Sequence, residues 1–183
     1  MIMTVSELRQ FITTDIEDIV LEAKLQALEL LIRAYTNNNF QVRALRAVAV
    51  AASTGNQLLT NVVHPFKAGD TLQITDSELN AGLVNVKTSS NGTLTVKEEL
   101  YDESGVIITK VKYPLDVKMG VANLMKWELD NRDKVGVASE TISRHSVTYI
   151  DFNGGNAIMG YPKSLLGFLK PYMKARFGQG VRV

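Results

Sequence analysis

Several features that mark common protein classes are absent from this sequence. Its 183 residues include no cysteine, which excludes disulfides, thiolate catalysis and cysteine-based zinc sites. His64 and His145 are its two histidines, and neither lies in a metal-ligand spacing such as HExxH. No run approaches about 20 consecutive apolar residues, and the N-terminus lacks a signal-peptide pattern. We therefore expect an intracellular protein with no membrane span, no metal and no cofactor.

Motifs for common enzymatic chemistry are absent as well. The sequence has no GxxxxGK[ST] or GxGxxG phosphate loop and no GxSxG nucleophile elbow. His145 lies near Ser143 and Ser146, but neighbouring residues along a strand point to opposite faces, which disfavours a catalytic pair. The sequence therefore predicts no catalytic residues and a protein that is not an enzyme.

A large net charge of either sign is also lacking. Twenty Lys and Arg residues stand against 19 Asp and Glu residues, which argues against a surface that grips nucleic acid throughout. The distribution is uneven: residues 1–40 hold six acidic and three basic residues, whereas residues 161–183 hold five basic residues and no acidic one. Such a basic end, interleaved with aromatic residues, suits binding to phosphates or docking on an acidic protein surface.

A long amphipathic helix is predicted between Asp15, a candidate N-cap, and Asn37, which tolerates the left-handed conformation of a helix end. At about 100° per residue, its apolar side chains form two stripes separated by a narrow polar face. Two interpretations stay open: a central helix of a small bundle, or a helix whose second stripe contacts another subunit. The first stripe is Ile16, Ile19, Val20, Ala23, Ala27, Leu30, Leu31 and Ala34; the second, the candidate subunit interface, is Leu21, Leu25, Leu28, Ile32 and Tyr35; the polar face is Asp18, Glu22, Gln26, Glu29 and Arg33.

Residues 41–113 change to a β-type pattern. Residues 71–75 alternate polar and apolar side chains, as a half-buried strand does. Alternating runs also flank Asn91-Gly92, a strong hairpin signal because both turn positions accept positive φ. Residues 106–111 form another predicted strand. About four to six strands in this segment indicate a small antiparallel sheet or an open barrel.

Helical periodicity returns at Pro114, a good first helical residue, and the predicted helix ends near residues 131–134, before Gly136. Pro162 opens a last predicted helix, which Pro171 should kink or stop. The expected apolar side of this last helix comprises Leu165, Leu166, Leu169, Tyr172 and Met173.

Together these segments predict an α+β fold, with a small helical bundle core and an inserted antiparallel β-sheet or open-barrel subdomain. Residues 1–40 would supply the N-terminal helices of the core, and residues 41–113 the β-rich insertion. Residues 114–183 would supply the C-terminal helices of the core and a basic tail.

Several short motifs resemble the head–tail connector, or adaptor, proteins of long-tailed bacteriophages. The resemblance covers roughly residues 1–40 and 114–183, and the β-rich insertion departs from the compact members of that family. The motifs are Ala34-Tyr35-Thr36-Asn37, Val121-Ala122-Asn123-Leu124-Met125-Lys126-Trp127, residues 136–143, Ser146-Val147-Thr148-Tyr149, and Gly160-Tyr161-Pro162 followed by Leu165, Leu166 and Leu169.

The resemblance implies a structural protein of the virion neck. Such adaptors form a homo-oligomeric ring, usually of twelve subunits, beneath the portal protein. The ring extends the channel through which double-stranded DNA passes without tight binding, and it presents a platform to a downstream neck or tail-completion protein. By position, the candidate portal-docking residues are Tyr161, Lys170, Tyr172, Lys174, Arg176, Phe177 and Arg182, and the candidate channel or inter-subunit residues are Arg144, His145 and Tyr149.

A nucleic-acid-binding module is the alternative function that the sequence leaves open. It would use the β-rich insertion as an open barrel, together with the cations of the C-terminal end. Salt-sensitive binding of short DNA by the isolated protein would separate this alternative from a ring subunit.

Overall fold

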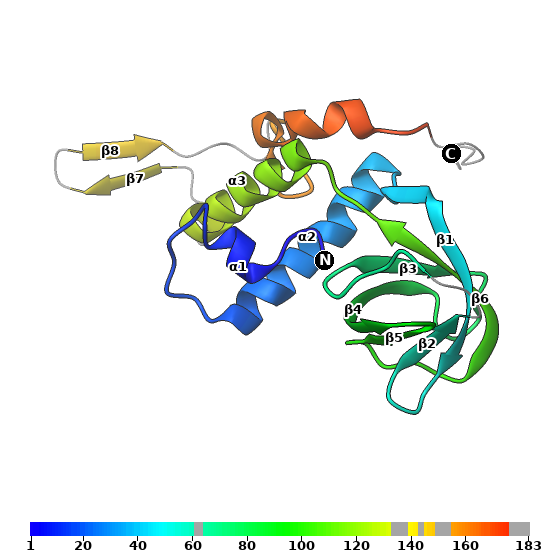
Figure 1. Cartoon of the computed structure of the whole chain (residues 1–183). Helices are drawn as coiled ribbons and strands as arrows, with labels where there is room; N and C mark the ends of the chain where they lie inside the picture. The colour runs from blue at the N-terminus through cyan, green and yellow to red at the C-terminus, as the bar shows by residue number, and fades with distance from the viewer. Residues whose placement is uncertain (61–63, 133–138, 143–144, 149–154, 176–183) are drawn as a thin grey trace. The chain divides into compact units, whose positions relative to one another are not determined.

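The computed structural model describes residues 1–60, 64–132, 139–142, 145–148 and 155–175 (Figure 1). The chain divides into two compact units. We call Met1–Ile2 with Asn39–Tyr113 the barrel unit, and Met3–Asn38 with Pro114–Val183 the helical unit.

The barrel unit is a closed barrel of six antiparallel strands (Figure 1). Around the barrel the strands follow the order β1-β2-β5-β4-β3-β6, and β6 pairs with β1 to close it. The strands are β1 (Gln41–Ala52), β2 (Gln57–Thr60), β3 (Thr71–Thr75), β4 (Gly82–Ser90), β5 (Thr93–Val96) and β6 (Glu103–Val111).

Closure of the barrel corrects the predicted fold class. The β1–β6 ladder runs from Gln41 opposite Val111 to Ala51 opposite Glu103, with two register shifts along β1. Such irregularities bend a strand, and β1 pairs with β6 on one side and with β2 on the other, so that Ala49, Val50 and Ala51 pair with both. The prediction of a helical bundle core with an inserted sheet or open barrel is therefore wrong. The closed barrel is the main element and has a hydrophobic core of its own.

The barrel core follows from alternation along the strands, which turns every second side chain inward. In β3, Leu72 and Ile74 are buried, and in β6 Val106 and Ile108 are buried. Side chains from all six strands and the adjoining loops fill the interior, among them Ala49, Leu58, Phe66, Val84, Val86, Leu94, Val96 and Leu100.

The predicted Asn91-Gly92 turn is confirmed. It joins β4 to β5, and Gly92 has φ 75°, a conformation that side-chain-bearing residues rarely adopt. A Cβ at Gly92 would also lie 3.0 Å from the carbonyl oxygen of Thr60. The tight turn therefore depends on glycine for both its dihedral angle and its clearance.

The helical unit contains two long helices, α2 (Asp18–Thr36) and α3 (Leu115–Asn131), and a short helix α1 (Val5–Leu8). A 3₁₀ helix, η2 (Lys163–Tyr172), packs against both long helices. Two small antiparallel pairs complete the described part of the unit. They are β7 (Ser139–Ile142) with β8 (His145–Thr148), and β9 (Ala157–Ile158) with β10 (Tyr161–Pro162).

Only the C-terminal end of α2 has the cap that the sequence predicts. Asn37 is left-handed, with φ 49°, and ends the helix as predicted. At the other end Glu17 is the N-cap, without a side-chain hydrogen bond, so the prediction of Asp15 as the cap is wrong. The hydroxyl of Thr14 instead accepts a hydrogen bond from the backbone N–H of Ile16 at 3.3 Å.

The last helix has 3₁₀ rather than α geometry, which changes the side chains that share a face. At about 3.0 residues per turn, Leu166, Leu169 and Tyr172 follow one row. Leu166 and Leu169 are buried, whereas Met173, which the α-helical pattern assigned to the same side, is 49% exposed. The helix ends one residue after Pro171, in agreement with the predicted stop.

Candidate interaction surfaces

One side of α2 is exposed and carries no charge. We call Ile19, Val20, Ala23, Ala27, Leu30 and Ala34 the apolar face of α2; all six are exposed, Ile19 at 73% and Leu30 at 61%. Between Ile19 and Thr36, Gln26 is the one other exposed residue. Exposed helix faces in soluble proteins are ordinarily rich in charged and polar side chains. The apolar face of α2 is therefore a candidate contact surface.

The residues predicted as the subunit interface lie on the opposite side of α2. Leu21, Leu25 and Ile32 are fully buried within the chain and Leu28 is 3% exposed, while Tyr35 is partly buried. This side of the helix packs in the helical unit, where α2 contacts α1, α3 and η2. The four aliphatic side chains therefore belong to the subunit's own core, and their prediction as an interface is wrong.

The predicted polar face of α2 is in part buried as well. Glu29 and Arg33 are 3% and 8% exposed, so they lie at the inward side of the helix. Large leucine and isoleucine side chains gain more from burial than alanines do, because burial energy follows apolar area. The inward stripe has four such residues, whereas half of the apolar face of α2 is alanine, so the observed orientation is the favourable one.

A groove lies between α3 and η2. It has a volume of about 700 Å³, and its apolar lining includes Leu115 at 72% and Met119 at 41% exposure. Gly120 forms part of its floor, where the ring of Phe168 from η2 approaches the backbone of α3. We call this the α3–η2 groove; its lining is Leu115, Asp116, Met119, Gly120, Asn123, Ser164, Leu165 and Phe168.

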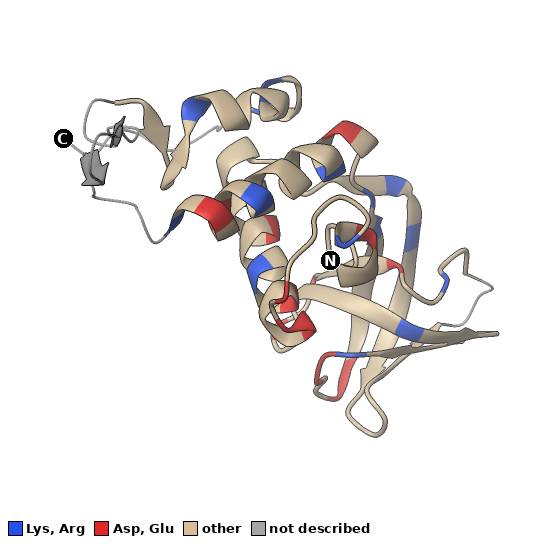
Figure 2. Cartoon of the chain, turned by 90° about the vertical axis from the view of Figure 1, so that its left-hand side faces the viewer, with Lys and Arg blue, Asp and Glu red and all other residues tan. Residues whose placement is uncertain are grey.

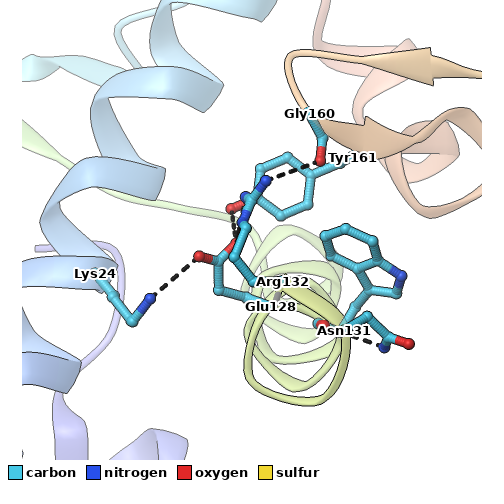
Figure 3. Close-up of polar contacts among 7 residues, drawn as sticks. Lys24, Glu128, Asn131, Arg132, Gly160 and Tyr161 are labelled. Carbon is cyan, nitrogen blue, oxygen red and sulfur yellow. Dashed lines mark hydrogen bonds and ion pairs between the residues drawn. The ribbon is translucent and has the colours of Figure 1, made fainter. Parts of the chain in front are cut away.

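Glu128 on α3 collects hydrogen-bond donors from three parts of the helical unit (Figure 3). Lys24 of α2 donates to its Oε1 at 3.1 Å, and the Tyr161 hydroxyl donates to its Oε2 at 2.8 Å. Arg132 donates to Oε2 through Nε at 2.9 Å and through Nη2. Nη1 of Arg132 also donates to the carbonyl of Gly160 at 3.2 Å, so the cluster joins α2, α3 and β10.

The electrostatics of this cluster favour a charged carboxylate and a neutral phenol. Burial alone would raise the pKa of Glu128, but hydrogen bonds from Arg132, Tyr161 and Lys24 outweigh it and lower the pKa to about 2. Burial, and then the hydrogen bond to Glu128, raise the pKa of Tyr161 to about 12. The guanidinium of Arg132 also lies over the rings of Tyr161, at 4.8 Å, and Trp127, at 5.5 Å. Every group has a partner within the subunit, which indicates a structural role.

The structure separates the predicted portal-docking residues. Tyr161 is 5% exposed and bound to Glu128, so its prediction as a docking residue is wrong. Lys170 and Lys174 are exposed, whereas the hydroxyl of the partly buried Tyr172 donates to Asp116 at 2.7 Å. The two charged residues of η2, Lys163 and Lys170, are both lysines, so this helix carries no acidic side chain (Figure 2). The remaining docking candidates, Arg176, Phe177 and Arg182, lie outside the described residues.

The predicted channel or inter-subunit residues fall in the segment around β7 and β8. Arg144 and Tyr149 lie outside the described residues, and His145 is the first residue of β8. The two strands pair from Ser139 opposite Thr148 to Ile142 opposite His145 and form a sheet of their own.

The barrel unit offers few features of a nucleic-acid or metal site. Of its aromatic residues, Phe40, Phe66 and Tyr113 are buried and Tyr101 is exposed, so stacking platforms for bases are scarce in its described part. The described residues of the whole chain also contain no group of three or more potential metal ligands. None of the helices in the described part has both the length and the apolarity needed to cross a membrane.

A carboxylate in the barrel unit is likewise engaged in structure. Glu103 accepts hydrogen bonds from the Ser77 hydroxyl at 2.6 Å, the Glu78 amide at 2.7 Å and the Asn80 side chain at 2.8 Å. These bonds, led by that of Ser77, lower the pKa of Glu103 to about 2. Glu103 therefore stabilises the loop between β3 and β4.

No protein-family model matches the chain, and no curated protein sequence matches it either.

Proposed function

We propose that this chain is a structural subunit of the neck of a long-tailed bacteriophage. Copies of it form a ring beneath the portal protein in the virion, extend the DNA channel and connect the head to a downstream neck or tail-completion protein. The observation that carries the proposal is the exposed, charge-free apolar face of α2. The sequence resemblance to adaptor proteins supplies the biological setting.

The energetic argument concerns the solvent exposure of this face. Full burial of an Ile or Leu side chain stabilises by about 1.5–3 kcal/mol, and Ile19 and Leu30 are both mostly exposed in the single chain. Covering them in an assembly recovers that energy at every subunit contact. A ring repeats the same contact around its axis, so a modest gain per contact stabilises the whole ring.

The β7–β8 pair gives a second reason to expect neighbouring chains. An isolated two-stranded hairpin is marginally stable in water and usually needs further packing. Among the described residues, β7 and β8 form a sheet of two strands. A ring would provide packing for this pair at a subunit contact or along the channel.

The charge distribution suits a channel through which DNA moves. A formal charge of +1 keeps phosphate contacts weak, so DNA can pass without being held. The exposed cations Lys170 and Lys174 lie at and just beyond the end of η2. These lysines remain candidates for docking on an acidic surface of the portal.

Negative-stain electron microscopy and sedimentation of the purified protein test this proposal, with and without its portal. We expect rings, or subunits that assemble when the portal is added. The Leu30→Lys variant should fold normally but lose assembly, because it sets a charge in the centre of the contact. Leu79→Lys is the matched control: Leu79 is 60% exposed in the barrel unit, nearly as much as Leu30 at 61%.

Two outcomes would contradict the proposal. One is a protein that stays monomeric at high concentration and also with the portal. The other is equal assembly by the Leu30→Lys and Leu79→Lys variants, which would remove the observation on which the proposal rests.

A further inference from the structure

A closed ring requires two different surfaces on each subunit. In a ring with rotational symmetry each copy contacts the next head to tail, so one surface meets a dissimilar one. The helical unit carries two such surfaces, the apolar face of α2 and the α3–η2 groove. We propose that the apolar face of α2 of one copy docks into the α3–η2 groove of the next copy. This inference rests on the proposed function and specifies its subunit contact.

The apolar face of α2 does not contact the α3–η2 groove of its own chain. The buried stripe of α2, represented by Leu25 and Ile32, faces the subunit's interior, where α2 contacts α3 and η2. The apolar face of α2 is on the other side of the helix; of its six residues, Ala27 also borders a small pocket that Met125 and Glu128 of α3 line. A second copy is therefore needed to bring this face to a groove.

The apolar face of α2 has the pattern of a helix that packs closely on another element. Val20, Ala23, Ala27, Leu30 and Ala34 are spaced by three and four residues alternately, as in a coiled-coil seam. The alanines in the centre allow close approach of the backbone, while Val20 and Leu30 supply bulk on either side. A narrow ridge of this kind fits a groove better than it fits a flat surface.

The groove has matching chemistry and a compatible length. Leu115, Met119 and Phe168 give it apolar walls, so the contact would remove apolar surface from water on both sides. Its α3 wall, Leu115 to Asn123, extends about 12 Å at 1.5 Å per residue. About two turns of α2, from Ala23 to Leu30, fit into that length.

Charged residues lie beside both surfaces. Glu17 is exposed at the N-terminal end of α2, close to Ile19 and Val20, whereas the neighbouring Asp18 pairs with Arg9 at 2.6 Å. The groove is bordered by the exposed Lys163 at the start of η2, and its lining includes Asp116, whose carboxylate accepts a hydrogen bond from the Tyr172 hydroxyl at 2.7 Å. Glu17 beside one surface and Lys163 beside the other favour contact between different copies.

The absence of cysteine from the chain allows a direct test. We would prepare the full-length double variant Ala27→Cys/Asn123→Cys, both single variants, and the control Ala27→Cys/Lys87→Cys. Positions 27, 123 and 87 are all exposed, so the substitutions leave the fold intact. Each protein is treated with a short bis-maleimide under assembling conditions, with the portal if required, and resolved on a denaturing gel.

The expected result is a ladder of dimers, trimers and larger species from the Ala27→Cys/Asn123→Cys variant, because head-to-tail contacts link each copy to two neighbours. The single variants and the Lys87 control should remain monomeric. Dimers from Ala27→Cys alone would overturn the inference in favour of α2–α2 pairing. Rings on micrographs without any ladder would overturn the inference while leaving the proposed function. The absence of both rings and cross-links would overturn both.

Discussion

The ring of Phe168 occupies the space that a side chain at position 120 would need. A Cβ on Gly120 would lie 2.4 Å from Cε1 and Cζ of Phe168, far inside van der Waals contact. Gly120 is in the interior of α3, where glycine is normally unfavourable compared with alanine. The close approach of η2 to α3 explains why glycine stands there.

Gly120→Ala tests this relationship. Alanine returns about 1 kcal/mol of helix propensity, but displacing the Phe168 ring from its packed position costs about 1–3 kcal/mol. We expect a net loss in the free energy of unfolding, measured by urea denaturation.

The same substitution in a Phe168→Ala background provides the control. With the ring removed, Gly120→Ala should become neutral or stabilising, since propensity then acts alone. An equal loss in both backgrounds would show that Phe168 is not the reason for glycine.

The Glu128 cluster makes stability depend on pH in the acid range. The pKa of Glu128 is about 2 in the folded chain and 4.5 in its ordinary range, so the stabilisation is complete above about pH 4.5. It is lost as the pH falls from there towards 2. We expect Glu128→Gln to lower the free energy of unfolding at pH 7 and to weaken its pH dependence between these values.

Glu103→Gln is the matched control for this experiment, because Glu103 also has a pKa of about 2 but lies in the barrel unit. Each variant should remove a separate part of the acid sensitivity, and the double variant should remove both. A pH dependence for Glu128→Gln that parallels the unmodified protein would contradict the assignment.

Leu25→Asp distinguishes the core stripe of α2 from a contact surface. Leu25 is fully buried, so the variant places an unpaired carboxylate in the helical unit and should destabilise it by at least about 3 kcal/mol. Ala23→Asp on the exposed side of the same helix should change the stability by about 0.5 kcal/mol or less. Circular dichroism at low protein concentration measures both. A folded Leu25→Asp protein that only fails to assemble would restore the original interface prediction.

The start and end of the barrel unit lie side by side. The amide of Lys112 donates to the carbonyl of Phe40 at 3.0 Å, and the rings of Phe40 and Tyr113 are 4.8 Å apart. We therefore expect a chain in which a short Gly-Ser linker replaces residues 41–111 to retain its helices. Far-ultraviolet circular dichroism and a cooperative thermal transition measure this.

A smaller deletion serves as the control for that experiment. Removing residues 41–60 alone takes away β1 and β2 and leaves unpaired edges on β5 and β6, so this variant should aggregate. Loss of the helical signal in the larger deletion would mean that the helical unit needs the barrel for its folding.

Local signals in the sequence were sufficient for several elements. The Asn91-Gly92 turn, the strand at residues 71–75 and the left-handed Asn37 depend on interactions within a few residues, and all are confirmed. Barrel closure depends instead on pairing between Gln41 and Val111, at opposite ends of the β-rich segment. Alternation along a strand gives no information about its partner, so the closed barrel could not be derived.

The interaction surfaces show the same limit. Periodicity identified two apolar stripes on α2 but could not decide which one faces inward, since that depends on the helices that pack against it. The resemblance assigns Tyr161 to portal docking by its position alone, while its partner Glu128 lies 33 residues away. The i, i+4 spacing of Glu128 and Arg132 was a readable sign of a structural ion pair.

Closure of the barrel has a consequence for crowding. A neck assembly would hold many identical barrels at a very high local concentration. Under that condition, unpaired strand edges pair with one another and cause aggregation. Because β1 pairs with β6, the barrel presents no such edge. In the described part of the chain, unpaired edges remain only on the two short hairpins, β7–β8 and β9–β10. Within the described residues, a partner that binds by adding a strand would therefore bind at these hairpins and not at the barrel.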